Sequence, residues 1–239
     1  DLWSLIFALG IRQVGEKAAK VLAARFGTMD ALAAASEDEL TAIDDVGPIT
    51  ARYIRQWMDS PQSRDLLARL KAMDEALARA RQAVEIVPES SELAFTLGSL
   101  LDSLGKRDEA MKVMQGIIPS HPEHYQALNY VGYSLAVQGK DLEHALELLQ
   151  RADRLAPDQF FIVDSLAWAL FRLGRTEEAL QNIRRAVALV PSPEAEILEH
   201  YGDIAAAAGQ KEEARKAYEQ ALKLKPANAE SLRQRLGDL

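Results

Sequence analysis

The 239-residue chain contains no cysteine, and its aromatic residues amount to only 6%. The absence of cysteine excludes disulfides, thiolate metal sites and thiol-based catalysis, and it leaves the redox compartment open. No apolar run reaches the length of about 18 residues that a membrane-spanning helix needs. Alanine, leucine and charged residues, the last at 27%, dominate instead, which is typical of a soluble all-helical protein.

The chain also lacks a basic region. Its net charge is −8, with 9 basic and 10 acidic residues up to Ala72 and 19 and 26 in the remainder. Electrostatics alone therefore predict no strong attraction to nucleic acid or to a membrane surface. The sequence starts at Asp1 without a signal peptide, which we interpret as a fragment, a processed form or a recombinant product.

Proline and glycine are absent from a long stretch in the first half, between Pro61 and Pro88. The stretch reads PQSRDLLARLKAMDEALARARQAVEIVP and is rich in good helix formers. Ser60 can cap a helix there, Pro61 suits the first helical position, and Pro88 ends the run. We predict one continuous helix over about 61–87, roughly 39 Å long at about 1.5 Å per residue.

Two similar units precede this helix. In each, an apolar helix is followed by a turn that ends in Val-Gly, at Gly15 and Gly47, and a second helix then begins. A glycine at the turn lets the backbone approach a phosphate, and the free N–H groups at the start of the next helix face that phosphate. The pattern predicts two helix-hairpin-helix units that hold duplex DNA by its backbone and read no sequence.

The run LIFALGIRQVGEKAAKVLAARFGTMDALAAASEDELTAIDDVGPITARYIRQWM closely resembles the helix-hairpin-helix domain of bacterial NAD-dependent DNA ligases, from about Leu2 to Leu70. In that family the domain grips nicked duplex DNA through hairpin amides. The nucleotidyltransferase domain with its adenylated lysine has no counterpart here, so the resemblance implies no catalysis. It implies DNA-backbone contacts at Gly10, Ile11, Val14, Gly15, Lys17, Val46, Gly47, Ile49 and Thr50.

A structural role remains the alternative for this module, which could serve only as a folding unit or spacer. Asp44 and Asp45 lie at the second hairpin, where their charges repel phosphate. A lone module of this kind makes few phosphate contacts, so we expect weak binding that depends strongly on salt.

The rest of the chain, 73–239, has an internal period of 34 or 35 residues. Prolines and turn glycines recur at this spacing, and a small residue precedes each repeat-ending proline by 12 positions. The pattern resembles tetratricopeptide repeats, which implies a right-handed solenoid of helix pairs. Five second helices but only four first helices match, and Ala227–Leu236 is expected to form a capping helix. The recurring positions are Pro88, Pro122, Pro157, Pro191 and Pro226, and Gly105, Gly139, Gly174 and Gly209.

The missing first helix falls in the ligase-like segment, so the long helix over 61–87 would belong to both modules. Natural domain boundaries usually fall in exposed linkers, whereas this junction falls near Lys71–Ala76 within a helix. We therefore interpret the chain as an engineered fusion of a module at 1–72 with an array at 73–239; a natural recombinant is the alternative. In either case the continuous helix is expected to fix the relative orientation of the modules.

The tetratricopeptide resemblance implies a peptide groove lined by the first helix of each repeat. The family's carboxylate clamp is not reproduced at these positions, so the aromatic side chains are expected to hold an apolar or extended peptide. The alternative is that Tyr133, Trp168 and Phe171 pack between neighbouring repeats. The groove residues we predict are Asn129, Tyr133, Phe161, Asp164, Trp168, Phe171 and Arg172, with Gln126 and Val137 beside them.

No catalytic or cofactor site is indicated. His121 and His124 flank a turn proline, and His144 and His200 are isolated, so no metal site is expected. Walker and Rossmann glycine loops are absent. The sequence therefore predicts an all-α, non-enzymatic scaffold without cofactors that joins a DNA-binding module to a protein- or peptide-binding array. The alternative is a natural adaptor that recruits a protein partner to DNA. Its compartment would be cytoplasmic if it follows the ligase-like part.

Overall fold

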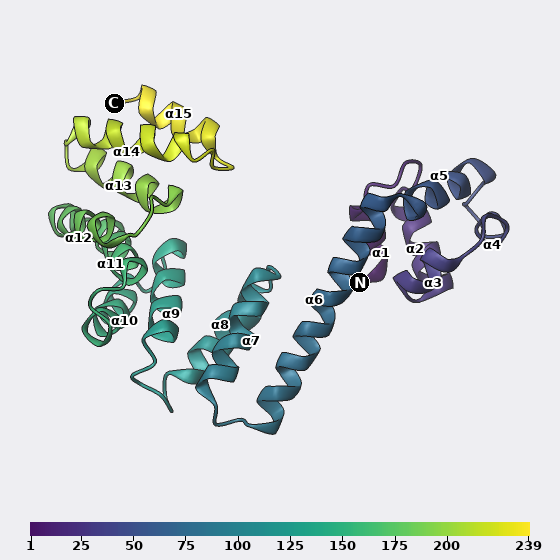
Figure 1. Cartoon of the computed structure of the whole chain (residues 1–239), viewed down its shortest axis with the longest axis horizontal. Helices are drawn as coiled ribbons and strands as arrows, with labels where there is room; N and C mark the ends of the chain where they lie inside the picture. Colours follow the sequence, from purple (N-terminus) through teal and green to yellow (C-terminus); the bar gives the residue numbers. More distant parts are fainter. The chain divides into compact units, whose positions relative to one another are not determined.

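The computed structural model describes all 239 residues and contains fifteen α-helices and no β-strand, which confirms the predicted all-α class. Figure 1 shows the helices in chain order. The chain divides into two compact units, Asp1–Ala76 and Leu77–Leu239. None of the helices combines the length and the apolar character that crossing a lipid bilayer requires.

The first unit contains five helices and the start of a sixth. Its core consists of apolar side chains from all of them, among them Ile6, Leu22, Leu32, Leu40 and Ile54, each with no exposed surface. Where the sequence offers a capping residue the backbone uses it. The helices are α1 (Leu2–Ala8), α2 (Glu16–Phe26), α3 (Met29–Ala34), α4 (Glu37–Thr41) and α5 (Pro48–Asp59).

Two helix ends of this unit have residues suited to capping. Gly27 ends α2 in the left-handed conformation, with φ +69°. Ser36 and Glu39 form a capping box at the start of α4, in which each side chain accepts a hydrogen bond from the other residue's backbone N–H. The bonds are 3.2 Å long for the Ser36 hydroxyl and 2.8 Å for the Glu39 carboxylate.

The long helix is present as α6 (Pro61–Ile86), which runs uninterrupted from the first unit into the second. Pro61 is its first residue, and the Ser60 hydroxyl accepts a hydrogen bond from the Ser63 N–H at 3.2 Å, as an N-cap does. In the second unit, its last turns contribute Leu77, Ala80 and Val84 to a cluster with Leu97 and Leu101 of the next helix.

The second unit is built from antiparallel helix pairs (Figure 1). Each pair is joined by a turn whose glycine has positive φ, between +66° and +76°, at the four positions that the sequence predicts. The expected capping helix is also present, beginning two residues later than predicted. The helices are α7 (Ser91–Ser103), α8 (Arg107–Ile117), α9 (Tyr125–Gln138), α10 (Leu142–Leu155), α11 (Phe160–Arg172), α12 (Thr176–Leu189), α13 (Ala195–Ala207), α14 (Lys211–Lys223) and α15 (Ala229–Gly237).

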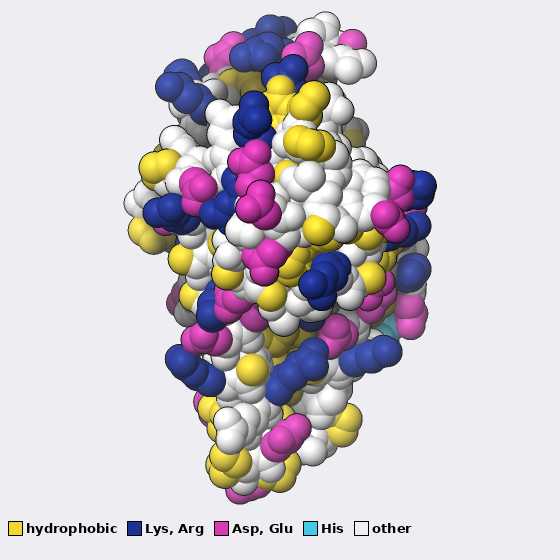
Figure 2. All heavy atoms as spheres, turned by 90° about the vertical axis from the view of Figure 1, so that its right-hand side faces the viewer, with side chains coloured by type: hydrophobic (Ala, Val, Ile, Leu, Met, Phe, Trp, Pro, Cys, Tyr) yellow, Lys and Arg dark blue, Asp and Glu magenta, His cyan; other side chains and the backbone are white.

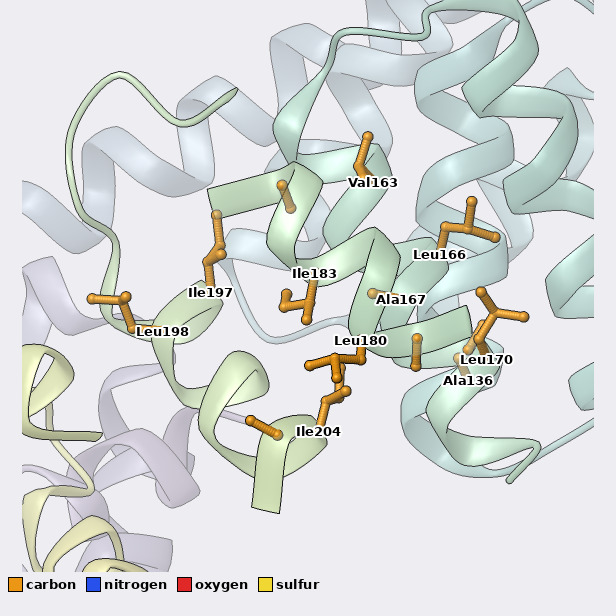
Figure 3. Packing of buried hydrophobic residues seen from close by; sticks show 14 of the residues in the cluster. Ala136, Val163, Leu166, Ala167, Leu170, Leu180, Ile183, Ile197, Leu198 and Ile204 are labelled. Atoms are coloured by element: carbon orange, nitrogen blue, oxygen red, sulfur yellow. The ribbon is translucent and has the colours of Figure 1, made fainter. Parts of the chain in front are cut away.

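The main core of this unit lies between α9 and α15 and includes Val163, Ile183 and Ile204, each with no exposed surface. Figure 3 shows side chains of α11, α12 and α13 directed into the space between these helices. Small residues allow the helices of a pair to approach. A Cβ at Gly202 would lie 2.2 Å from the Tyr218 ring, and one at Gly132 would lie 2.7 Å from Leu149 Cγ.

Candidate nucleic-acid and peptide interfaces

The two hairpins of the first unit share one backbone conformation. Gln13 and Asp45 both adopt left-handed φ, +66° and +68°. The residue after each, Val14 or Val46, donates its N–H to the carbonyl three residues earlier, at 3.0 and 3.1 Å. The glycine that follows is extended, with φ/ψ of −84°/177° at Gly15 and −75°/170° at Gly47. Both hairpins therefore lead into the next helix in the same way.

The helices that follow the hairpins begin without a side-chain cap. Gly15 and Gly47 are the N-cap residues of α2 and α5, whereas Thr28 and Ser36 cap α3 and α4 with their hydroxyls. The first N–H groups of α2 and α5 have no partner within the chain. A helix start with free N–H groups and a positive dipole end attracts an anion. The free groups are those of Gly15, Glu16 and Lys17 and of Gly47, Ile49 and Thr50.

The fold itself does not require glycine at these two N-caps. Gly15 and Gly47 have ordinary extended backbones, and no atom lies within 4 Å of the place where a Cβ would stand. Gly10 differs, because its φ of +63° is a conformation that favours glycine. The open space in front of Gly15 and Gly47 leaves room for a group from outside the chain to approach the backbone.

The other predicted contact residues fall into two groups. The side chains of Ile11, Val14 and Val46 are buried in the core of the unit, so only their backbones could face a ligand. Ile49 is 67% exposed, and the Lys17 side chain also reaches solvent. The buried aliphatic side chains thus anchor the two hairpins in the core and hold their exposed backbone in place.

Charges of both signs surround the hairpins. Lys17 Nζ in the first hairpin helix lies 2.9 Å from Asp45 Oδ1 in the second hairpin, so the two hairpins lie side by side. Arg12 lies over the Tyr53 ring, with 4.9 Å between its Cζ and the ring centroid. Figure 2 shows Lys and Arg side chains interspersed with Asp and Glu over one face of the molecule. Backbone amides, rather than a basic patch, therefore offer the distinct anion-binding feature.

In the second unit, four of the seven predicted groove residues line one cavity of about 170 Å³. Asn129 and Tyr133 come from α9, and Phe161 and Asp164 from α11. The Tyr133 hydroxyl donates a 2.6 Å hydrogen bond to Glu196 Oε1. Burial, followed by this bond, raises the pKa of Tyr133, which therefore stays protonated. The remaining lining residues are Ser165, Glu194, Glu196 and Ile197.

The other three predicted groove residues do not line this cavity. Arg172 donates to the carbonyls of Ala136 and Val137 at 2.9 Å each, so its guanidinium caps the end of α9. Trp168 stacks on His200, with 4.3 Å between ring centroids, and Phe171 lies 5.3 Å from Trp168. The Arg172 bonds and the Trp168–His200 contact link adjacent repeats, and for Trp168 this is the packing role that the alternative interpretation gave to aromatic side chains.

A buried ion pair lies beside the cavity. His200 Nδ1 is 2.9 Å from Asp164 Oδ1, and the two residues are only 7% and 6% exposed. Burial acts to lower the pKa of His200, but the hydrogen bond and charge of Asp164, with Glu196 and Asp203, outweigh it and raise the pKa above its ordinary value. The pair thus links α11 to α13 most strongly when His200 is protonated.

Replacing Asp164 by asparagine should lower the pKa of His200, because burial then acts without its main opposing charge. A histidine with a raised pKa stabilises the folded state fully below about pH 6.5, its unfolded value, and loses that contribution as pH rises through the folded value. Proton NMR titration of His200 in both forms measures the difference. An unchanged titration in Asp164→Asn would show that the pair does not set this pKa.

Several residues at these sites were missed from the sequence. Phe161, Asp164 and Trp168 occupy groove positions of one repeat, and the equivalent positions of the next repeat, 35 residues later, are Glu196, Glu199 and Asp203. The repeat spacing could therefore have identified these acidic residues. The Lys17–Asp45 pair gave no such signal, because its residues are 28 positions apart in different hairpins.

Comparisons with known proteins match one family in the first part of the chain and two related families in the remainder, with an overlap at residues 59–67. Residues 4–67 match the family described as helix-hairpin-helix motif. Residues 59–129 and 165–229 match two families described as tetratricopeptide repeat. The chain therefore contains a helix-hairpin-helix module followed by tetratricopeptide repeats, as predicted.

Among curated proteins, DNA ligases are similar to this chain. The DNA ligase of Marinobacter nauticus is 53% identical over 70 residues, which are 29% of this chain and 10% of that protein. The DNA ligase of Acidobacterium capsulatum is 41% identical over 178 residues, or 73% of this chain and 24% of that protein. The chain thus spans a tenth to a quarter of the length of these ligases.

Solved structures resemble the fold. A thermophilic TPR protein of Thermus thermophilus superposes with a TM-score of 0.54 at 23% identity, over 72% of this chain and 93% of that one. MamA of Desulfovibrio magneticus RS-1, residues 41 to the end, gives 0.51 at 22% identity over 70% and 90%. At these identities the likeness concerns the fold alone.

Proposed function

We propose that this chain, which joins a helix-hairpin-helix module to tetratricopeptide repeats, is a non-enzymatic adaptor. Its first unit binds the backbone of duplex DNA, and its second unit binds a protein or peptide in the groove of the repeats. The proposal is the same whether the junction arose by design or in nature, because both origins leave the two binding surfaces in one chain.

The DNA-binding part of the proposal is based on the similar N-termini of α2 and α5. Both helices begin at an extended glycine with open space in front of it and with unpartnered N–H groups behind it. Two such starts in neighbouring hairpins, joined by the Lys17–Asp45 ion pair, offer two anion sites. Contacts of this kind go to phosphates and carry no sequence information.

The repeats support the second part of the proposal. Their first helices form a cavity lined by polar, aromatic and acidic side chains, which suits the binding of a protein or peptide segment. No group of His, Asp and Glu side chains is arranged to hold a metal ion. The cavity and its lining are the features on which we base a binding role for this unit.

A titration of labelled nicked duplex DNA tests the proposal. Binding is expected at about 50 mM salt and should weaken about tenfold at about 200 mM, if two cationic side chains neutralise phosphates. Duplexes of unrelated sequence should bind alike, because backbone contacts do not distinguish bases. Absence of binding at the lower salt concentration would restrict the first unit to a structural role.

A further inference from the structure

The cavity between α9, α11 and α13 is acidic and rich in hydrogen-bond acceptors. Asp164, Glu194 and Glu196 line it, and no Lys or Arg side chain does. The Ser165 hydroxyl donates inward to the Phe161 carbonyl at 2.8 Å, and the Tyr133 hydroxyl donates to Glu196. Both hydroxyl donors are therefore already used within the chain. An occupant would therefore need to supply both donors and positive charge.

The size of the cavity limits what can enter. Its volume of about 170 Å³ is smaller than the roughly 300–1,000 Å³ of pockets that hold drug-sized ligands, so a single side chain is a better match. A metal ion is a poor candidate, because the carboxylates do not form a group able to coordinate one. Tyr133 and Phe161 add aromatic surface, which attracts cations.

At the C-terminal end of the repeats, carboxylates and a tyrosine of the chain already bind a cationic side chain. Arg235 of α15 donates to Asp203 at 2.8 and 2.7 Å and also donates to Glu199 Oε1. Its guanidinium also lies near the Tyr218 ring, 5.8 Å from the centroid. Two carboxylates and a tyrosine thus bind an arginine within the array. The cavity presents a comparable set of groups in Glu194, Glu196 and Tyr133, but without an arginine of its own, whereas Asp164 already pairs with His200.

We propose that this cavity is an arginine-binding subsite, which takes the side chain of an arginine residue in a peptide bound to the repeats. The proposal rests on the peptide-binding part of the proposed function and names the chemistry of that partner. Glu196 and Glu194 would pair with the guanidinium. Arginine suits the site better than lysine because its planar fork of five donors can serve several acceptors at once.

Capped five-residue peptides test the assignment, each with alanine at every position except the centre. One carries arginine at the centre and the other carries citrulline, which has a similar shape but no charge. Each is titrated into the intact chain and followed by ¹⁵N–¹H NMR. The arginine peptide should shift the amides of Asn129, Ser165 and Ile197 saturably and bind at least about tenfold more tightly than the citrulline peptide, since charge-assisted hydrogen bonds are the stronger kind.

A variant in which two cavity carboxylates become amides tests whether their charges bind the arginine side chain. Glu194→Gln/Glu196→Gln should weaken the arginine peptide about tenfold, while the amide oxygen introduced at position 196 still accepts from Tyr133. Glu177→Gln/Glu219→Gln, which removes two exposed carboxylates elsewhere, should leave binding unchanged. Equal binding of both peptides, or an unaffected Glu194→Gln/Glu196→Gln variant, would overturn the arginine subsite but leave a peptide groove. If neither peptide binds, both the subsite and the peptide-binding part of the proposed function fail.

Discussion

The variant Gly15→Glu/Gly47→Glu should bind nicked duplex DNA at least about a hundredfold more weakly than the wild type, or about tenfold for each hairpin. Each new carboxylate would stand in front of unpartnered helix N–H groups, where it would repel a phosphate and block its approach. The fold should persist, because both glycines have extended backbones and no atom lies within 4 Å of the added Cβ.

The matched control is Gly116→Glu/Gly237→Glu, which changes the net charge equally at two exposed glycines of the second unit that also have open space. This control should bind DNA as the wild type does. Fluorescence anisotropy at low salt measures all three proteins. If the hairpin variant and the control weakened binding equally, net charge rather than the hairpins would account for the loss.

The second large effect concerns packing within the repeats. Gly202→Ala should lower the free energy of unfolding of the second unit by at least about 2 kcal/mol, as overpacking of a well-filled core does. The added Cβ would lie 2.2 Å from the Tyr218 ring. That ring is buried, and its hydroxyl donates to Asp203 at 2.7 Å, so it has little freedom to move aside.

Substitutions at two other glycines provide comparisons for the loss of stability expected from Gly202→Ala. A Cβ at Gly98 would meet only the Met114 side chain, 2.6 Å away, and a flexible methionine can move, so the loss should be smaller. Gly116→Ala meets no neighbour and should be neutral or stabilising by up to about 1 kcal/mol, because alanine favours a helix. Urea unfolding followed by Trp168 fluorescence, with Trp3 and Trp57 replaced by phenylalanine, reports this unit. A loss at Gly202 no larger than at Gly98 would contradict the packing argument.

Features with a local cause could be predicted from the sequence. The capping box at Ser36, the start of the long helix at Pro61 and the turn glycines at intervals of 34 or 35 residues each depend on neighbours a few positions away. The repeat period then indicated the helix pairs, because identical spacing reproduces the same local geometry in every repeat. Backbone signals of this kind also identified the two hairpins.

Contacts between distant residues could not be predicted in the same way. Arg172 was expected in the groove, yet its guanidinium bonds the carbonyls that end α9, 35 and 36 residues earlier. His200 was considered isolated, yet it pairs with Asp164 across adjacent repeats. In both cases the repeat pattern indicated the position of the residue on its helix. Which of several nearby polar groups the side chain would reach depends on the packing of neighbouring repeats.

The measurement that tests the central claim most directly is a ¹⁵N–¹H NMR titration of the intact chain with nicked duplex DNA at low salt. The account predicts the largest shifts at the amides that begin α2 and α5, namely those of Gly15, Glu16, Lys17, Gly47, Ile49 and Thr50. It also predicts small shifts in the repeats, where the cavity near Glu196 is acidic. Shifts concentrated outside the hairpins, or none at all, would contradict the claim that these helix starts bind the DNA backbone.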